Sequence, residues 1–228
     1  MVNAFKDPGI ADGETSVYAA TIGDDPTQHE VSAVVTHDAE QYRAVIEASM
    51  PIDFKMKVEQ RFRRTNGTLT ADSYVSESWH GDKLVSREEG HFIETAHLQF
   101  GGKVEPFPSR MTPLLGAMTV FRGLDFAKGA KSKVDVWLAF SIYWPIEAKV
   151  EKRTEVEVPA GKFDSWQVKV RPSFSHINGL LDKVIGGILP PFVLHFDAAG
   201  SHRMLRFSFP TGPMPWNPKA VIALTKAG

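Results

Sequence analysis

Alternating apolar and charged side chains dominate the stretch from Phe54 to Arg64, and lysine, glutamate and arginine fill the positions between the apolar ones. A repeat of two residues places one face of a β-strand in the core and the other in water. Asn66-Gly67 follows directly, and this pair favours a tight hairpin because both residues tolerate positive φ angles. The stretch therefore predicts antiparallel strands with one buried face. Its alternating apolar residues are Phe54, Met56, Val58 and Phe62.

The same pattern predicts further strands along most of the chain. A return strand follows at 68–79, and His80-Gly81-Asp82 turns the chain into another strand that ends near Glu94. A longer hairpin is predicted from alternating residues at 134–144, with Pro145 at its turn and a charged return strand through Val150 to Val158. Residues 38–50 favour a helix by composition, but their alternation is interpreted as a strand. Other predicted strands cover 162–171, 192–197, 202–209 and 220–225.

Two segments break the alternation and predict helices. Thr112-Pro113 resembles a helix start, apolar residues follow at helical spacing, and Gly123 provides a stop. The second segment, Asn178 to Leu189, carries one apolar stripe and ends at Pro190-Pro191. It is too short to cross a bilayer. We expect it to pack on the concave face of the sheet as a cover, and a movable lid is the more specific alternative.

The order of these elements predicts the fold class. We expect a single domain over residues 1–228, mainly β with minor α, built as a large curved antiparallel sheet or half-barrel. One or two helices would cover its concave face. Such an arrangement leaves space between sheet and helices, where hydrophobic ligands bind in other proteins.

Composition excludes several classes of protein. The chain has no cysteine, which excludes disulfides and thiolate chemistry, and 26 basic against 27 acidic residues give no cationic face for nucleic acid. No stretch reaches the length of a transmembrane segment. The first residues lack the apolar run of a secretory signal. We therefore expect a cytoplasmic protein if Met1 is the native start, and a periplasmic one if a leader has been removed.

Several short motifs are similar to those of a known group of proteins. Val156–Asp164 (VEVPAGKFD) resembles the V-P-A-G-x-F segment of an uncharacterised bacterial family. Arg122–Gly129 (RGLDFAKG) is similar to that family's approach to its long hairpin, and Asn66–Leu69 and Pro190-Pro191 lie where the pattern places them. The resemblance covers the chain from about Gly13 onward. It implies a half-barrel similar to the lipoprotein carriers LolA and LolB, which hold acyl chains, and it supplies no catalytic residues.

Sequence motifs for catalysis are sparse. Neither a nucleophile elbow nor a phosphate-binding loop nor a dinucleotide fingerprint is present. His91 and His97 lie about 20 Å apart on an extended strand, so we expect no bound metal and no cofactor. The more notable cluster is His195-Phe196-Asp197 with His202 and Arg203. A hairpin at 198–200 would bring His195 near Arg203, and a histidine beside the Asp197 carboxylate and an arginine would form a tuned acid–base pair. An exposed hairpin end with a structural histidine is the alternative.

The leading interpretation is a protein that binds a hydrophobic small molecule, either lipid-like or aromatic. The alternative is a cofactor-independent lyase or isomerase that acts on an aromatic or polycyclic substrate, with His195 or Tyr143 as its acid–base group. Aromatic residues on neighbouring strands are candidates to line the cavity, and arginines are candidates to neutralise an acidic headgroup. The candidate ligand-binding residues are Trp137, Trp144, Arg171, His176 and Arg203.

Overall fold

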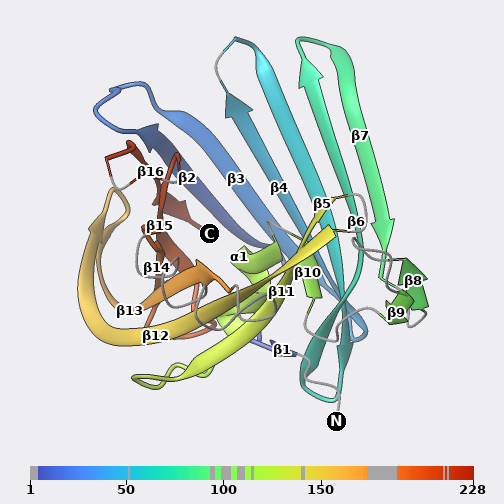
Figure 1. The fold of residues 1–228 in the computed structure, drawn as a ribbon. Coiled ribbons are helices and arrows are strands. Elements are labelled where there is room, and N and C mark those ends of the chain that lie inside the picture. Colours follow the sequence, from blue (N-terminus) through green and yellow to red (C-terminus); the bar gives the residue numbers. More distant parts are fainter. Residues whose placement is uncertain are drawn as a thin grey trace.

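The strands form one long, strongly curved sheet whose two ends come back toward each other (Figure 1). The computed structural model describes residues 5–50, 52–92, 96–98, 104–106, 111–113, 116–139, 142–173, 189–212, 214 and 216–228. The first half of the sheet contains β1 (Phe5–Lys6), β2 (Glu14–Ile22), β3 (His29–His37), β4 (Gln41–Met50), β5 (Phe54–Thr65), β6 (Thr68–His80) and β7 (Lys83–His91). The second half contains β10 (Met111–Pro113), β11 (Lys131–Ala139), β12 (Ile142–Val158), β13 (Gly161–Pro172), β14 (Phe192–Asp197), β15 (Met204–Pro210) and β16 (Lys219–Ala227).

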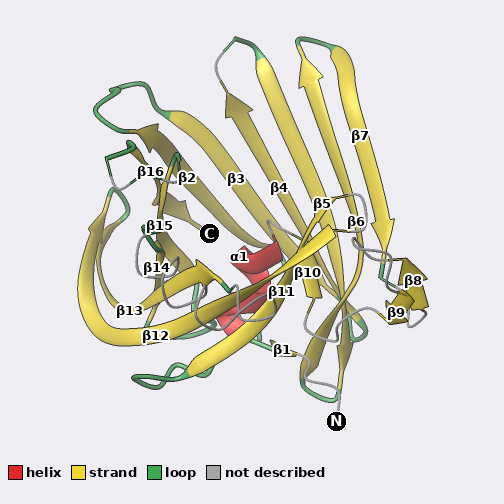
Figure 2. Ribbon diagram, in the orientation of Figure 1, coloured by secondary structure: helices red, strands yellow, loops and turns green. Residues whose placement is uncertain are grey.

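Neighbouring strands in this 14-stranded sheet are antiparallel, except that β10 pairs in parallel with β11. Their order is β1-β6-β5-β4-β3-β2-β16-β15-β14-β13-β12-β11-β10, with β7 paired to β6. The β2–β16 pair joins the two halves of the sequence. Strand β10 at one end of the sheet lies against β6 near the other end, so the sheet curls like a barrel without a closing strand pair among the described residues. Two short strands, β8 (Ala96–Leu98) and β9 (Val104–Pro106), form a separate hairpin (Figure 2).

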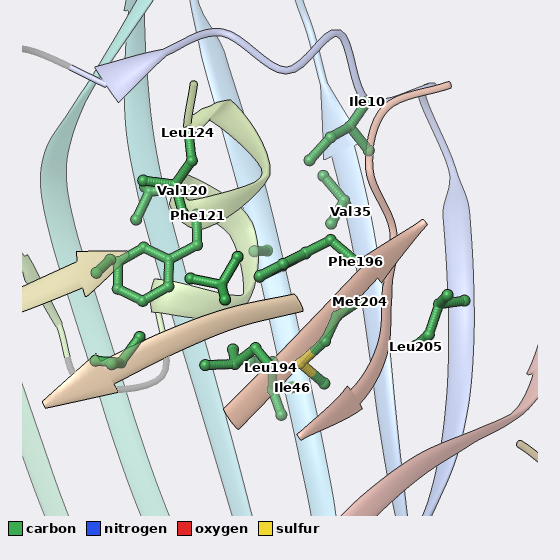
Figure 3. Packing of buried hydrophobic residues seen from close by; sticks show 14 of the residues in the cluster. Ile10, Val35, Ile46, Val120, Phe121, Leu124, Leu194, Phe196, Met204 and Leu205 are labelled. Atoms are coloured by element: carbon green, nitrogen blue, oxygen red, sulfur yellow. The ribbon is translucent and has the colours of Figure 1, made fainter. Parts of the chain in front are cut away.

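A short helical segment lies inside the curve of the sheet. Helix α1 (Ala117–Val120) continues into the 3₁₀ helix η2 (Phe121–Gly123). A Cβ atom at Gly123 would lie 1.9 Å from the carbonyl oxygen of Lys6, so only glycine allows β1 to pass this closely. The segment brings its apolar side chains into the main core (Figure 3). There Val120, Phe121 and Leu124 gather with Leu194, Phe196 and Met204.

The predicted fold class is confirmed: the described chain is mostly strand, in a large curved sheet. The Asn66-Gly67 turn has φ angles of 50° and 75°, which explains why this pair was a reliable signal. Residues 41–50 form β4, as the alternation predicted. Strands β2 and β3 were not predicted.

Two predicted details are wrong. Thr112 and Pro113 do not begin a helix but belong to β10, where they pair with Val136 and Trp137 at the edge of the sheet, a position that tolerates proline. Pro145 is not at a turn. It lies within β12 opposite Asp135, just before the stretch that pairs with β13.

The predicted helical cover at Asn178 to Leu189 lies outside the described residues, apart from Leu189 itself. The candidate ligand-binding residue His176 also lies outside them. Within the described part of the chain, no helix is long and apolar enough to span a membrane.

Candidate ligand-binding face

The inward-facing side chains of the sheet become more exposed to solvent toward one end of the strands. Along β4 the exposed fraction rises from 0% at Tyr42 to 7% at Ala48 and 41% at Met50. Along β2 it rises from 3% at Tyr18 to 51% at Ile22. Strands β2 and β4 run in the same direction because both are antiparallel to β3. The core therefore fills one end of the curved sheet and leaves the other end, the upper one in Figure 1, partly uncovered.

Three phenylalanines on β14 and β15 continue this uncovered surface. Phe207 pairs with Leu194, a buried core residue, so its ring faces inward, and Phe192 and Phe209 lie on the same face two positions away. The Phe207 and Phe209 rings are 4.7 Å apart, and Phe192 lies 6.2 and 6.3 Å from them in edge-on contacts. All three are only half-buried. We call the inward-facing, incompletely buried apolar residues at this end the open face: Ile22, Met50, Phe54, Met56, Phe192, Phe207 and Phe209.

The opposite side of the curve is polar. Ser76 and Ser78 on β6 face inward beside Val58 and Met56 of β5. Glu88 on β7 pairs with Ser76 and so faces the same side. The uncovered surface therefore combines an aromatic side with a hydroxyl- and carboxylate-bearing side, which is suited to an amphiphilic small molecule.

Tyr74 connects the two ends of the sheet. The Trp137 Nε1–H donates to the Tyr74 hydroxyl at 2.8 Å, and this hydroxyl in turn donates to Glu88. Phe92 stacks on the Tyr74 ring and meets Trp137 edge-on. Burial, together with the hydrogen bond to Glu88, raises the pKa of Tyr74 above its usual range, so the phenol stays protonated at neutral pH. Trp137, which was expected to bind ligand, therefore has its indole N–H occupied in this junction.

His195 lies on the outer face, because Leu194 and Phe196 on either side of it are buried in the core. It pairs with Arg206 across a β-bulge, and not with Arg203 as the predicted hairpin required. The six-residue connection at 198–203 and the bulge change the register. Its Nε2 lies 3.3 Å from the Gln167 amide, and burial with the charge of Arg206 lowers its pKa to about 4. The imidazole is therefore neutral at pH 7.

Asp197 does not complete the expected acid–base pair with His195. Its carboxylate accepts a hydrogen bond from the Ala199 N–H at 2.9 Å and so stabilises the turn. Tyr143 pairs with Trp137 across the β11–β12 hairpin, near the Tyr74 junction. The structure does not bring His195 and Tyr143 together, because His195 pairs with Gln167, which pairs with Lys152, nine residues along β12 from Tyr143. Catalytic roles for either residue stay predictions.

The remaining predicted binding residues fall into different surroundings. Trp144 pairs with the buried Val136, on the core-facing side of β12. Arg171 is half-exposed and lies 3.4 Å from Glu147 on the outer surface. Arg203 lies 3.4 Å from Glu14 and donates to the Gly228 carbonyl at 3.0 Å. The two arginines thus have carboxylate partners within the protein.

Sequence reasoning missed a buried ion pair between Arg122 and Glu14. Arg122 of η2 donates from Nη1 and Nη2 to the two carboxylate oxygens at 2.6 and 3.0 Å, and from Nε to the Ser201 carbonyl at 2.7 Å. The side chains are 5% and 8% exposed. Burial alone would raise the pKa of Glu14, but the hydrogen bonds and charge of Arg122, with those of Arg203, lower it overall. The only hint of this pair in the sequence was a single arginine, Arg122, directly after an apolar stretch with helical spacing.

The space beneath α1 is too small for an organic ligand. A cavity of about 20 Å³ lies between Met118, Arg122 and the inner face of β2–β4, which is room for one water molecule. In the described residues, no cluster of three metal-ligating side chains occurs. His91 is exposed and lies 3.4 Å from Glu89.

Comparison with known proteins supports the fold alone. No family model and no curated protein matches the chain. A β-barrel-like protein of domain of unknown function DUF1849 from Brucella abortus is 13% identical over 95% of this chain and 97% of that chain, with a TM-score of 0.55. This likeness is consistent with an uncharacterised β-barrel-like family, whereas the expected similarity to LolA and LolB stays a prediction.

Two other solved structures are more distant. A proposed exported protein with a YmcC-like fold from Bacteroides fragilis is 10% identical, with 99% of both chains covered and a TM-score of 0.35. A proposed lipoprotein from Parabacteroides distasonis is 9% identical, with 99% of this chain and 100% of that chain covered and a TM-score of 0.31. Similarity at this level carries no argument about the present chain.

Proposed function

We propose that the protein binds a hydrophobic small molecule, an acyl chain or a flat aromatic ring system, against the open face. The observation that carries this proposal is that the inward-facing side chains become solvent-exposed toward one end of the strands although they remain apolar. Ile22 and Met50 are 51% and 41% exposed on the face that elsewhere forms the core. Exposed apolar surface on the inside of a curved sheet is characteristic of a ligand-binding surface.

The chemistry of the open face favours a ligand with aromatic or alkyl character. Phe192, Phe207 and Phe209 contact one another at ring-centroid distances of 4.7–6.3 Å and form one continuous aromatic surface, against which a further ring or an alkyl chain would pack. The side chains of Met50 and Met56 on the open face adapt to ligands of different shape because methionine is unbranched and flexible. The serines and Glu88 on the facing side would contact the polar end of an amphiphile.

Titration with a neutral apolar fluorophore, N-phenyl-1-naphthylamine, tests the proposal. We expect saturable fluorescence enhancement with the full chain, and binding weakened about tenfold or more in Phe207→Ser and Phe209→Ser, because burial of a phenylalanine is worth about 1.5–3 kcal/mol. Val34→Ser is the matched control, because Val34 is 37% exposed and faces outward on β3, next to the inward-facing Val35. Absence of saturable binding, or an equal loss in Val34→Ser, would contradict the proposal.

A further inference from the structure

Glu88 on β7 places a carboxylate on the inward side of the curved sheet. It pairs with Ser76, which in turn pairs with Val58, so the three side chains share one face. Val58 is 5% exposed and belongs to the core side of β5. The hydroxyl of Tyr74, which is 6% exposed, donates to Glu88 Oε1. Pairing and hydrogen bonding therefore both place the carboxylate inside the curve of the sheet.

The Glu88 carboxylate is accessible to a ligand of the open face. The exposed fraction across its row is 3% at Ile46 and 5% at Val58, whereas Ser76 is half-buried and Glu88 is exposed. Neighbouring strands lie about 4.8 Å apart, so Glu88 on β7 is about 10 Å across the sheet from β5, which carries Met56. A molecule whose apolar part lies against Met56 therefore reaches the carboxylate without entering the core.

Glu88 differs from the outward-facing glutamates beside it in having no basic partner. Glu77 and Glu89 lie 3.2 and 3.3 Å from the Arg87 guanidinium. In the part of the chain that the structure describes, no salt bridge involves Glu88. The inward-facing positions nearest to it are serines, at 76, 78 and 86, which carry no charge. The negative charge of Glu88 is thus not compensated within the described protein.

Aromatic rings lie on one side of this carboxylate. Phe92 stacks on the Tyr74 ring with 5.9 Å between the centroids, and the Trp137 indole N–H donates to the Tyr74 hydroxyl at 2.8 Å. A carboxylate beside aromatic rings is suited to a positively charged nitrogen, because the carboxylate supplies the opposite charge and the rings add cation–π attraction. A sulfate, phosphate or carboxylate group of a ligand would instead be repelled by Glu88.

We propose that the ligand of the open face is a cationic amphiphile, whose positively charged nitrogen binds Glu88 while its alkyl or aromatic part lies against Met56 and the rest of the open face. This inference rests on the proposed function and adds the charge of the head group to it. Glu88 is then the residue that determines specificity, and it favours amines over fatty acids and other anionic amphiphiles.

Competition for bound N-phenyl-1-naphthylamine tests the head-group preference. Decyltrimethylammonium, 1-decanol and sodium decyl sulfate have the same alkyl chain, and each would be added to the full chain below its aggregation limit at neutral pH and low salt. We expect decyltrimethylammonium to displace the fluorophore at a concentration about fivefold lower or more than decyl sulfate, because an ion pair and cation–π contacts at a partly exposed site are worth about this factor. The difference should decrease at high salt, which screens exposed charges. Equal displacement by the two ions, or a difference that salt does not reduce, would overturn the inference.

Substitution then assigns the preference to Glu88. Glu88→Gln keeps an oxygen that accepts from Tyr74, so the melting temperature should stay close to that of the wild type. About fivefold more decyltrimethylammonium should be needed for displacement, whereas the value for 1-decanol should not change. Glu89→Gln is the matched control, because it removes the same charge from the next residue, which pairs with Arg87 on the outer face, and it should behave like the wild type. Equal effects of the two substitutions on decyltrimethylammonium would overturn the role of Glu88.

The outcomes separate the two proposals. If the fluorophore does not bind at all, the proposed function fails, and the cationic head group fails with it. If the fluorophore binds and Phe207→Ser weakens its binding, but the cation displaces it no better than the anion, the open face binds ligand and only the inference about Glu88 is refuted.

Discussion

Replacing Arg122 with methionine should destabilise the protein more than any surface substitution. The guanidinium makes two hydrogen bonds to Glu14 at 2.6 and 3.0 Å and a third to the Ser201 carbonyl at 2.7 Å, and both charged side chains are more than nine-tenths buried. Removing one partner of a buried pair costs about 3–5 kcal/mol, and the Arg203 guanidinium, 3.4 Å from Glu14, compensates the remaining charge only in part. For a chain of this length, this corresponds to a drop in melting temperature of roughly 6–20 °C.

Thermal unfolding followed by circular dichroism measures this effect against a matched control. Arg153 and Asp164 form an ion pair with side chains 59% and 53% exposed, so Arg153→Met should leave the melting temperature nearly unchanged. The double variant Arg122→Met/Glu14→Gln should recover part of the loss, because the buried carboxylate charge is then removed as well. If Arg122→Met melts within about 2 °C of the wild type, the buried pair does not stabilise the fold.

The pH dependence of the same pair has a defined sign. The folded pKa of Glu14 is lowered from the usual value of 4.5, so its contribution to stability is present above that value and is lost as the pH falls through the lower folded pKa. Arg122→Met removes the main cause of the lowered pKa, and the smaller effect of Arg203 remains. Its stability should therefore depend less on pH below about 4.5 than that of the wild type, as measured by urea unfolding at a series of pH values.

Three further predictions concern other parts of the sheet. Gly90→Ala should destabilise the protein by about 1–3 kcal/mol in urea unfolding, because the new Cβ would lie 2.4 Å from the Tyr74 ring, and an unchanged midpoint would contradict this contact. Because the folded pKa of His195 is lowered from 6.5 to about 4, wild-type stability should fall as the pH drops through this window, and His195→Gln should reduce the slope; identical slopes would refute the assignment. Tyr143→Phe should leave the melting temperature nearly unchanged if Tyr143 lines a ligand site, whereas a large drop would identify a structural role.

The strands were predictable where one face is buried and the other charged. The β5–β6 hairpin follows from alternation and from Asn66-Gly67, whose positive φ angles are a local property of the two residues. Strands β2 and β3 lack such a contrast, since their outward positions include Val34 and other uncharged residues. The Pro145 error has a similar origin, because a proline within a strand is tolerated only where a neighbouring strand stops pairing, and pairing is a tertiary property.

The candidate site was less predictable than the fold. His195 and Asp197 alternate as expected, but a bulge and a six-residue connection set the register to Arg206, and neither feature has a clear sequence signal. The Glu14–Arg122 pair joins residues 108 positions apart, and only the curvature of the sheet brings them together. The sequence predicted apolar surface on the concave side of a curved sheet. It did not predict which residues are exposed there, because this depends on how far the core extends along each strand.

Methionine-methyl NMR tests most directly whether ligand binds at the open face and not in the closed core. Met50 and Met56 belong to the open face, whereas Met111 and Met204 are buried. With ¹³C-methyl-methionine labelling and assignment by single Met→Leu variants, titration with N-phenyl-1-naphthylamine should shift the Met50 and Met56 signals in a saturable way and leave Met111 and Met204 unchanged. Saturable shifts confined to Met111 or Met204, or none at Met50 and Met56, would contradict binding at the open face.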